Sequence, residues 1–211
     1  TAVGYEALKA NTSAEKNTAL GVKAGTSMTT GGFNTALGAY AVEECTTGTY
    51  NTGLGPWAMR SVTTAERNIG LGGRSGMEIT TGYNNIAIGY QALYTATTSS
   101  LNIAIGTEAL EHTTGNGSVA IGHQALEDNT TGNNCTFVGR NSGNLITTGA
   151  DNTGIGESAL KAHTTGHYNT AIGHEALQST TTGYQNTAVG ANSLTDNTTG
   201  GKNTSMGPLS M

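Results

Sequence analysis

A motif that returns with a period of 17 runs through the whole chain and constrains its fold more than any other feature. Each copy ends a short run such as Asn-Thr-Ala-Ile-Gly with a glycine, which we take as position zero of the copy. These anchor glycines are Gly4, Gly21, Gly38, Gly55, Gly72, Gly89, Gly106, Gly122, Gly139, Gly156, Gly173, Gly190 and Gly207. Their spacing is constant except from Gly106 to Gly122, where the copy is one residue shorter. Thirteen copies fill residues 1–211 without a break in composition, which predicts a single repeat array and no second domain.

The residues before each anchor glycine alternate in size. Position −1 is Leu, Ile, Val or Met, position −2 is small except for Phe137, and position −3 is Thr or a β-branched apolar residue. This alternation predicts a short strand whose side chains point to two opposite faces. We expect the larger apolar side chains to form the core and the small ones to leave a smooth stripe on the other face. The expected core residues are Leu20, Leu37, Leu54, Leu71, Ile88, Ile105, Ile121, Val138, Ile155, Ile172 and Val189.

A second apolar pulse follows the anchor, with Ala or Ser at position +3 and usually Leu, Val or Met at +4. It favours a second short strand, after which most copies turn through Thr-Thr-Gly. Glycine at fixed places indicates backbone with positive φ. The expected turn glycines include Gly21, Gly38, Gly89, Gly106, Gly122 and Gly173. The shortened copy is expected to lose its residue between Leu110 and Thr113, just ahead of the turn.

One such copy has too few inward side chains to fold alone, whereas stacked copies bury continuous columns and pair each strand with its neighbours. The chain is therefore predicted to be all-β, a parallel β-solenoid of thirteen coils. Asparagine recurs at position −4, where stacked amides can bond from coil to coil. These residues are Asn17, Asn34, Asn51, Asn68, Asn85, Asn102, Asn152, Asn169, Asn186 and Asn203. We expect the small-residue stripe to be covered in a symmetric homo-oligomer, and a trimer is the expectation for a fibre.

The run Ser118-Val119-Ala120-Ile121-Gly122, followed by Ala125 and Leu126, resembles the head repeat of YadA-like trimeric autotransporter adhesins. The copy from Asn169 to Gly173 is also similar to repeats of trimeric bacteriophage and bacterial fibres. The period of 17 is longer than that of the adhesin heads, because residues are added at the Thr-Thr-Gly turn. The resemblance implies a left-handed β-roll and a homotrimer. It further implies an extracellular segment of a longer fibre, on a virion tail fibre or a bacterial surface, that presents a receptor-binding tip.

Several function classes find little support in the sequence. The net charge of −5 and the absence of Lys/Arg runs disfavour a nucleic-acid partner or contact with a membrane surface. Acidic residues such as Glu6, Glu108, Glu157 and Glu175 follow the anchor in coils that are not all adjacent. Catalysis needs convergent groups in a concave site, so we expect no enzyme activity.

Metal and disulfide chemistry are weakly supported as well. His123 and His174 share a position but lie three coils apart, while His163 and His167 flank one turn without a third ligand and are expected to be solvated. We therefore expect no metal and no cofactor. Cys45 and Cys135 are about five coils apart and cannot pair within one chain.

Turn aromatics leave one binding hypothesis open. Trp57, Tyr83, Tyr90, Tyr168 and Tyr184 could contact a cell-surface receptor or stack on a glycan, or could instead shield the ends of the apolar columns. The alternative to a structural fibre is thus a ligand-binding array, such as a glycan-binding or ice-binding solenoid. Ice binding would use the regular threonine column, although adjacent threonines on an extended chain point in opposite directions.

Overall fold

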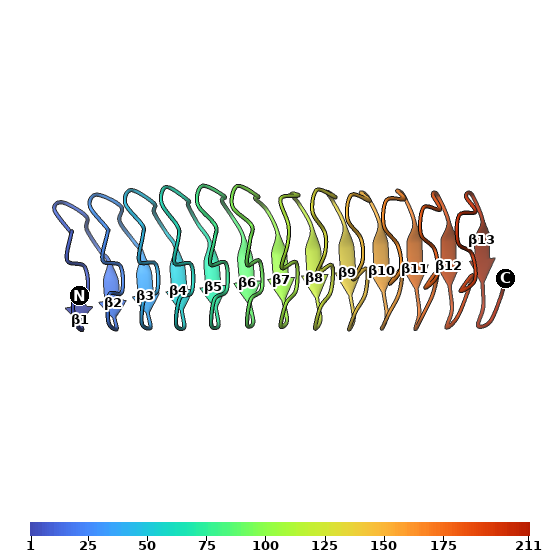
Figure 1. Ribbon diagram of the computed structural model, residues 1–211, viewed down its shortest axis with the longest axis horizontal. Coiled ribbons are helices and arrows are strands. Elements are labelled where there is room, and N and C mark those ends of the chain that lie inside the picture. The colour runs from blue at the N-terminus through green and yellow to red at the C-terminus, as the bar shows by residue number, and fades with distance from the viewer. The chain divides into compact units, whose positions relative to one another are not determined.

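The computed structural model describes residues 1–211 and divides them into two compact units, Thr1–Asn102 and Ile103–Met211. Each unit is a parallel β-solenoid in which every coil contributes one short strand, and no helix occurs (Figure 1). The first unit holds β1 (Ala2–Val3), β2 (Thr18–Leu20), β3 (Thr35–Leu37), β4 (Thr52–Leu54), β5 (Ile69–Leu71) and β6 (Ile86–Ile88). The second holds β7 (Ile103–Ile105), β8 (Val119–Ile121), β9 (Thr136–Val138), β10 (Thr153–Ile155), β11 (Thr170–Ile172), β12 (Thr187–Val189) and β13 (Thr204–Met206).

Equivalent positions of successive coils are paired in register. In the second unit, for example, Thr153 pairs with Thr170 and Ile155 with Ile172. The repeat of the sequence is thus the repeat of the structure, and each unit carries straight rows of chemically similar side chains. The predicted fold class, an all-β parallel solenoid, is confirmed for each unit.

The core lies on the face of the strand opposite to the one predicted. Position −2 is buried in β2 to β13, as at Ala36 and Ala171, whereas position −1 is exposed or half-buried in every coil. The expected core residues Leu20, Leu37, Leu54, Leu71, Ile88, Ile105, Ile121, Val138, Ile155, Ile172 and Val189 therefore line the outside of the sheet. The small-residue stripe, expected on the surface, is the inner face.

The narrowness of the coil explains this correction. The strand packs directly against the loop that follows it, so the space beneath position −2 takes little more than a methyl group. A Cβ atom added at Gly53 would lie 2.6 Å from the Cγ2 of Val42 and 3.0 Å from the carbonyl oxygen of Ala58. Phe137 fits at this position because two neighbours are glycines: a Cβ atom at Gly143 or Gly154 would collide with its ring.

The second apolar pulse forms loop rather than the predicted second strand. Residues at positions +2 and +4 have left-handed backbone, as at Glu175 (φ 55°) and Leu177 (φ 52°). Hydrogen bonds still join this loop from coil to coil; the N–H of Leu160, for instance, donates to the carbonyl oxygen of Ala176 at 3.0 Å. Alternating left-handed residues coil the chain tightly and bring Ala +3 and Leu +4 into the interior. The second apolar pulse therefore predicted the buried positions correctly, but the extended backbone expected for it was wrong.

The anchor glycines have a backbone that side chains rarely adopt. The expected turn glycines Gly21, Gly38, Gly89, Gly106, Gly122 and Gly173 have φ between 132° and 139°. A Cβ atom added at Gly106 would also lie 2.6 Å from the carbonyl carbon of Gly122 in the next coil. Both conformation and coil-to-coil approach therefore exclude a side chain at this position.

The shortened coil lacks one threonine of its turn, which corrects the predicted place of the deletion. Thr113 is buried like the position +7 residues of other coils, and the hydroxyl of Thr114 donates to the carbonyl oxygen of Thr130 at 2.7 Å. The hydroxyl of Thr130 makes the equivalent bond to Thr147. Positions up to +8 therefore keep their register, and the missing residue follows Thr114.

Candidate functional site

An apolar row runs along the outer face of the sheet in each unit. We call it the outer row, and it consists of the position −1 side chains of the strands. These are Val3, Leu20, Leu37, Leu54, Leu71 and Ile88 in the first unit and Ile105, Ile121, Val138, Ile155, Ile172, Val189 and Met206 in the second. Ile155 and Ile172 each retain 40% of their accessible surface. Position −3 adds a parallel row of Thr, Ile and Val. No charged residue interrupts either row, so the outer face can bury apolar surface but offers no acid, base or nucleophile.

The acidic residues considered from the sequence do not form a catalytic pair. Glu6 pairs with Lys9 at 2.7 Å, and Glu157 pairs with Arg140. Glu175 accepts a hydrogen bond of 2.9 Å from Asn192, and Glu108 accepts one of 3.0 Å from Gln124. Each acid is thus held by a basic or amide side chain of its own or a neighbouring coil.

One acidic cluster was missed by sequence reasoning. Carboxylate oxygens of Glu108, Glu111 and Glu127 lie within 4.8 Å of one another. Partial burial and the adjacent acids raise the pKa of Glu111, with burial the larger cause. Asn144 donates to Glu127 at 2.7 Å. Because the shortened copy stacks Glu111 beside Glu127, alignment of the coils is the signal that would have found the cluster.

His163 lies in the interior and not in a solvated turn as expected. Its side chain is fully buried at position +7, and its Nε2 is 2.8 Å from the carbonyl oxygen of Gly166. The Nδ1 atom has no hydrogen-bond partner. Burial lowers the pKa of His163, and the nearby charge of His167 lowers it further. The imidazole is therefore a neutral core group, which corrects the expectation of a solvated side chain.

We expect the stability of the second unit to fall as the pH drops below about 6.5, the unperturbed pKa of histidine. Because the folded-state pKa of His163 is lowered, the unfolded chain binds the proton more readily. The loss of unfolding free energy should approach about 1.4 kcal/mol per pH unit until the folded-state pKa is reached. Thermal unfolding followed from pH 7.5 to pH 5.0 measures it.

His163→Asn is the matched control for this pH dependence. At the equivalent position, Asn129 donates to the carbonyl oxygen of Gly132 at 2.9 Å, so an amide can replace the bond of His163 without titrating. The difference between the two pH profiles isolates His163 from the other titrating groups. Identical profiles would contradict the expectation.

The two cysteines are structural. Cys45 and Cys135 are free and buried, and burial raises the pKa of each thiol to about 11. Cys135 occupies an asparagine position of the repeat, and its Sγ lies 3.3 Å from the carbonyl oxygen of Gly149. Cys45 fills interior position +7 beneath the turn. Neither thiol is poised for nucleophilic chemistry, because the reactive thiolate is disfavoured.

The five aromatic residues considered for ligand contact do not gather at one place. Trp57 is stacked on Tyr40 with ring centroids 6.0 Å apart, and Tyr168 lies tilted against His167. Tyr83, Tyr90 and Tyr184 are exposed at other positions of their coils. Tyr40 and Trp57 were both recognisable as turn aromatics, but sequence reasoning did not predict that they stack on each other. The signal was the recurrence of aromatic residues at one position in consecutive copies.

The threonine column at position +8 is engaged within the solenoid. The hydroxyls of Thr29, Thr46 and Thr63 each donate to a backbone carbonyl of the next coil at 3.0–3.2 Å. The second unit repeats this pattern, as in the 3.1 Å bond from Thr164 to Thr181. Hydroxyl groups that are bonded within the solenoid do not form a free, regular array of the kind that ice binding would use.

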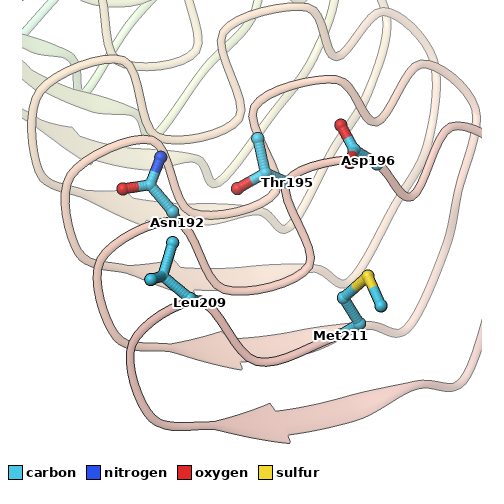
Figure 2. Close-up of a pocket in the computed structure, with 5 residues that line it drawn as sticks. All are labelled: Asn192, Thr195, Asp196, Leu209 and Met211. Atoms are coloured by element: carbon cyan, nitrogen blue, oxygen red, sulfur yellow. The ribbon is translucent and has the colours of Figure 1, made fainter.

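The last coil of the second unit has a shallow hollow on its surface. Figure 2 shows it between Asn192, Thr195, Asp196, Leu209 and Met211. Its side chains offer one carboxylate, Asp196, and one hydroxyl, Thr195, and no histidine, lysine or cysteine. The hollow therefore lacks the convergent groups that catalysis needs.

Comparison with known proteins returned no match among family models, curated proteins or solved structures. The chain also has no helix of the length and apolarity that a membrane crossing requires.

Proposed function

We propose that the chain is a structural segment of a homotrimeric fibre or adhesin, which holds a receptor-binding part away from a virion or a bacterial surface. The observation that carries this proposal is the outer row: an apolar line along each unit that the single chain leaves exposed. Exposed apolar surface of this continuity is typical of an interaction site. In an extracellular fibre its partner is a second and a third copy of the same chain.

The gain from covering the row supports self-association. Burying about 60 Å² of apolar surface on each side chain is worth about 1.5 kcal/mol at 25 cal/mol per Å². Repetition along the strands multiplies this gain, whereas the translational entropy lost on association is paid once per subunit. Cyclic symmetry keeps equivalent coils at one level, so each outer row meets side chains of similar shape. The number three comes from the resemblance of the Ser118–Gly122 motif to trimeric β-rolls.

The mechanism of such a segment is mechanical. Parallel strand pairing, amide ladders and interdigitated interior columns make each unit a stiff element that resists bending. A tip attached to it would be held at a fixed distance for attachment to a host cell or surface. None of these roles requires a cofactor or an active site.

The solution mass tests the proposal directly. Light scattering on residues 1–211 should give three times the chain mass of 21.4 kDa over a wide concentration range. A mass of 21.4 kDa at micromolar concentration would contradict the proposal and favour the ligand-binding alternative. Chemical cross-linking should stop at the trimer, because a cyclic assembly closes.

A further inference from the structure

Two ladders of cationic and aromatic side chains flank the strands of the first unit. The entry ladder consists of Lys16, Phe33, Tyr50 and Arg67, each two residues before its strand. The exit ladder consists of Lys23, Tyr40, Trp57 and Arg74, each three residues after the same strands, β2 to β5. Both ladders thus follow one order from coil to coil: lysine, two aromatic residues, arginine.

The two rings of each ladder are stacked, and three of the four cations lie over a ring. Phe33 and Tyr50 stack with centroids 4.7 Å apart and planes within 10°, and the Nζ of Lys16 lies 4.7 Å from the centre of the Phe33 ring. Tyr40 and Trp57 stack at 6.0 Å, with Lys23 at 5.7 Å from Tyr40 and Arg74 at 5.8 Å from Trp57. Each ladder is therefore an ordered strip that presents positive charge beside aromatic rings.

Three of the four ladder cations, Lys16, Lys23 and Arg74, form no salt bridge, although the charge of Lys23 helps to lower the pKa of Glu6. Arg67 meets Glu66 only at 3.4 Å with both side chains exposed. The other two cations of the unit differ, since Lys9 pairs with Glu6 and Arg60 with Glu43 at 2.7 and 2.8 Å. The ladders concentrate four of the six Lys and Arg residues of the first unit in four coils. The second unit has no counterpart, because Gln124, Asn141 and Glu175 occupy the exit position there.

We infer that the two ladders form a binding strip for a linear acidic polysaccharide, whose uronate or sulfate groups meet the cations while its sugar rings lie along the aromatic residues. The two cations of each ladder lie three coils apart, about 14 Å at a strand spacing of about 4.8 Å, so an extended chain of repeating sugars that runs along the coils can meet both of them. Cations held over rings bind anions with little additional ordering cost. The inference goes beyond the proposed function, since each ladder lies on a single chain and does not need the trimer.

The ring geometry favours a polysaccharide over single-stranded nucleic acid. Nucleic-acid strands are bound by stacking bases on open aromatic faces. Here Phe33, Tyr40 and Trp57 each have a neighbouring ring and a cation against them, which leaves their ring edges and polar tips for the ligand.

Trp57 is the only tryptophan of the chain, so its fluorescence reports directly on the exit ladder. Titration with oligogalacturonate and with heparin-derived oligosaccharides at low salt should give a saturable change in emission with at least one of them. Cello-oligosaccharides and dextran, which are neutral, should give none. Lys23→Gln with Arg74→Gln should weaken binding at least tenfold, because the rings remain while the charge is lost.

Lys9→Gln with Arg60→Gln is the matched control, because it removes the same charge from the same unit at cations that are already paired. Affinity within twofold of the parent is expected. Equal weakening by both double variants, equal binding of neutral sugars, tighter binding of oligothymidylate, or no emission change up to millimolar sugar would each overturn the inference. Solution mass measured on the same variants separates this result from any failure of the trimer.

Discussion

Ile155→Asp is expected to weaken the proposed trimer by about 100-fold or more while leaving the single chain folded. In the free chain this side chain retains 40% of its surface, so the carboxylate stays hydrated and changes the unfolding free energy by about 1 kcal/mol or less. In the proposed trimer three carboxylates would be buried at one level without partners, at a cost of about 3 to 5 kcal/mol for each uncompensated charge. Ile121→Asp added to it should give a monomer. Light scattering and circular dichroism measure the two effects separately.

Leu145→Asp is the control, because it has nearly the same exposure, 41%, but lies in a loop of the same unit away from the outer row. It should retain the mass of the parent. If both variants dissociate alike, the outer row is not the interface. If Ile155→Asp unfolds the isolated chain, the side chain belongs to the core and the observed burial pattern is wrong.

The sequence alone was sufficient to predict the coil length, the position of the strand and the asparagine rows. These features follow from a residue pattern that occurs in thirteen copies, so a substitution in one copy does not hide the pattern that the others share. The shortened copy could not be placed as well, because one missing threonine leaves no mark on the apolar pattern. The burial of Thr113 and the hydrogen bond of the Thr114 hydroxyl show where the missing residue lies.

The inner and outer faces could not be assigned from pattern alone. The alternation shows that the strand has two faces, but it does not show which one points inward, because Leu37 and Ala36 are both apolar. The usual preference for large side chains in a core assigns the leucine face to the interior, which is wrong here. The width of the coil decides, and that width depends on left-handed residues such as Leu177, whose backbone no propensity would predict. Pairs such as Phe137 with Gly154 were the available signal, since a bulky residue at an inner position needs a glycine nearby.

The ligand-contact residues were predictable only in part for a related reason. Single aromatic residues at turns carry little information, whereas consecutive coils place them in one ladder. Tyr40 and Trp57 are one full repeat apart in the sequence, which brings their rings to a stacking distance on neighbouring coils. An alignment of the copies places Tyr40 and Trp57 at the same position as Lys23 and Arg74, and this alignment would have grouped the four residues.

The asparagine side chains at position −4, which we call the asparagine ladder, link buried polar groups of successive coils. The Oδ1 of Asn169 accepts hydrogen bonds from the backbone N–H of Asn186 at 3.0 Å and from its side-chain amide at 3.1 Å. The Nδ2 of Asn169 donates to the Oδ1 of Asn152 at 3.1 Å and to the carbonyl oxygen of Gly183 at 2.9 Å. The side chain thus accepts from Asn186 and donates both to Asn152 of the preceding coil and to Gly183, which lies three residues before Asn186.

Asn169→Ala is therefore expected to cost about 3 kcal/mol, since it removes these bonds and leaves buried partners unsatisfied at about 1 kcal/mol or more each. The backbone amide of Asn186 should exchange its hydrogen about 100-fold faster, because local opening no longer breaks its bond to Asn169. Hydrogen exchange read residue by residue measures this, together with the thermal midpoint at one fixed protein concentration. The concentration is held constant because any assembly would shift the midpoint.

Two substitutions make the expectation specific to the ladder. Asn169→Ser should lose about half as much, because the hydroxyl of Ser118 at the same position accepts the backbone N–H of Cys135 at 3.2 Å. Asn203→Ala should cost well under 1 kcal/mol, since Asn203 is exposed in the last coil and its side chain makes one bond, a donation to Asn186 at 3.1 Å. Equal losses for Asn169→Ala and Asn203→Ala would mean that the ladder contributes nothing beyond local strand preference. A larger loss for serine than for alanine would contradict the acceptor role, because serine keeps the one bond that alanine lacks.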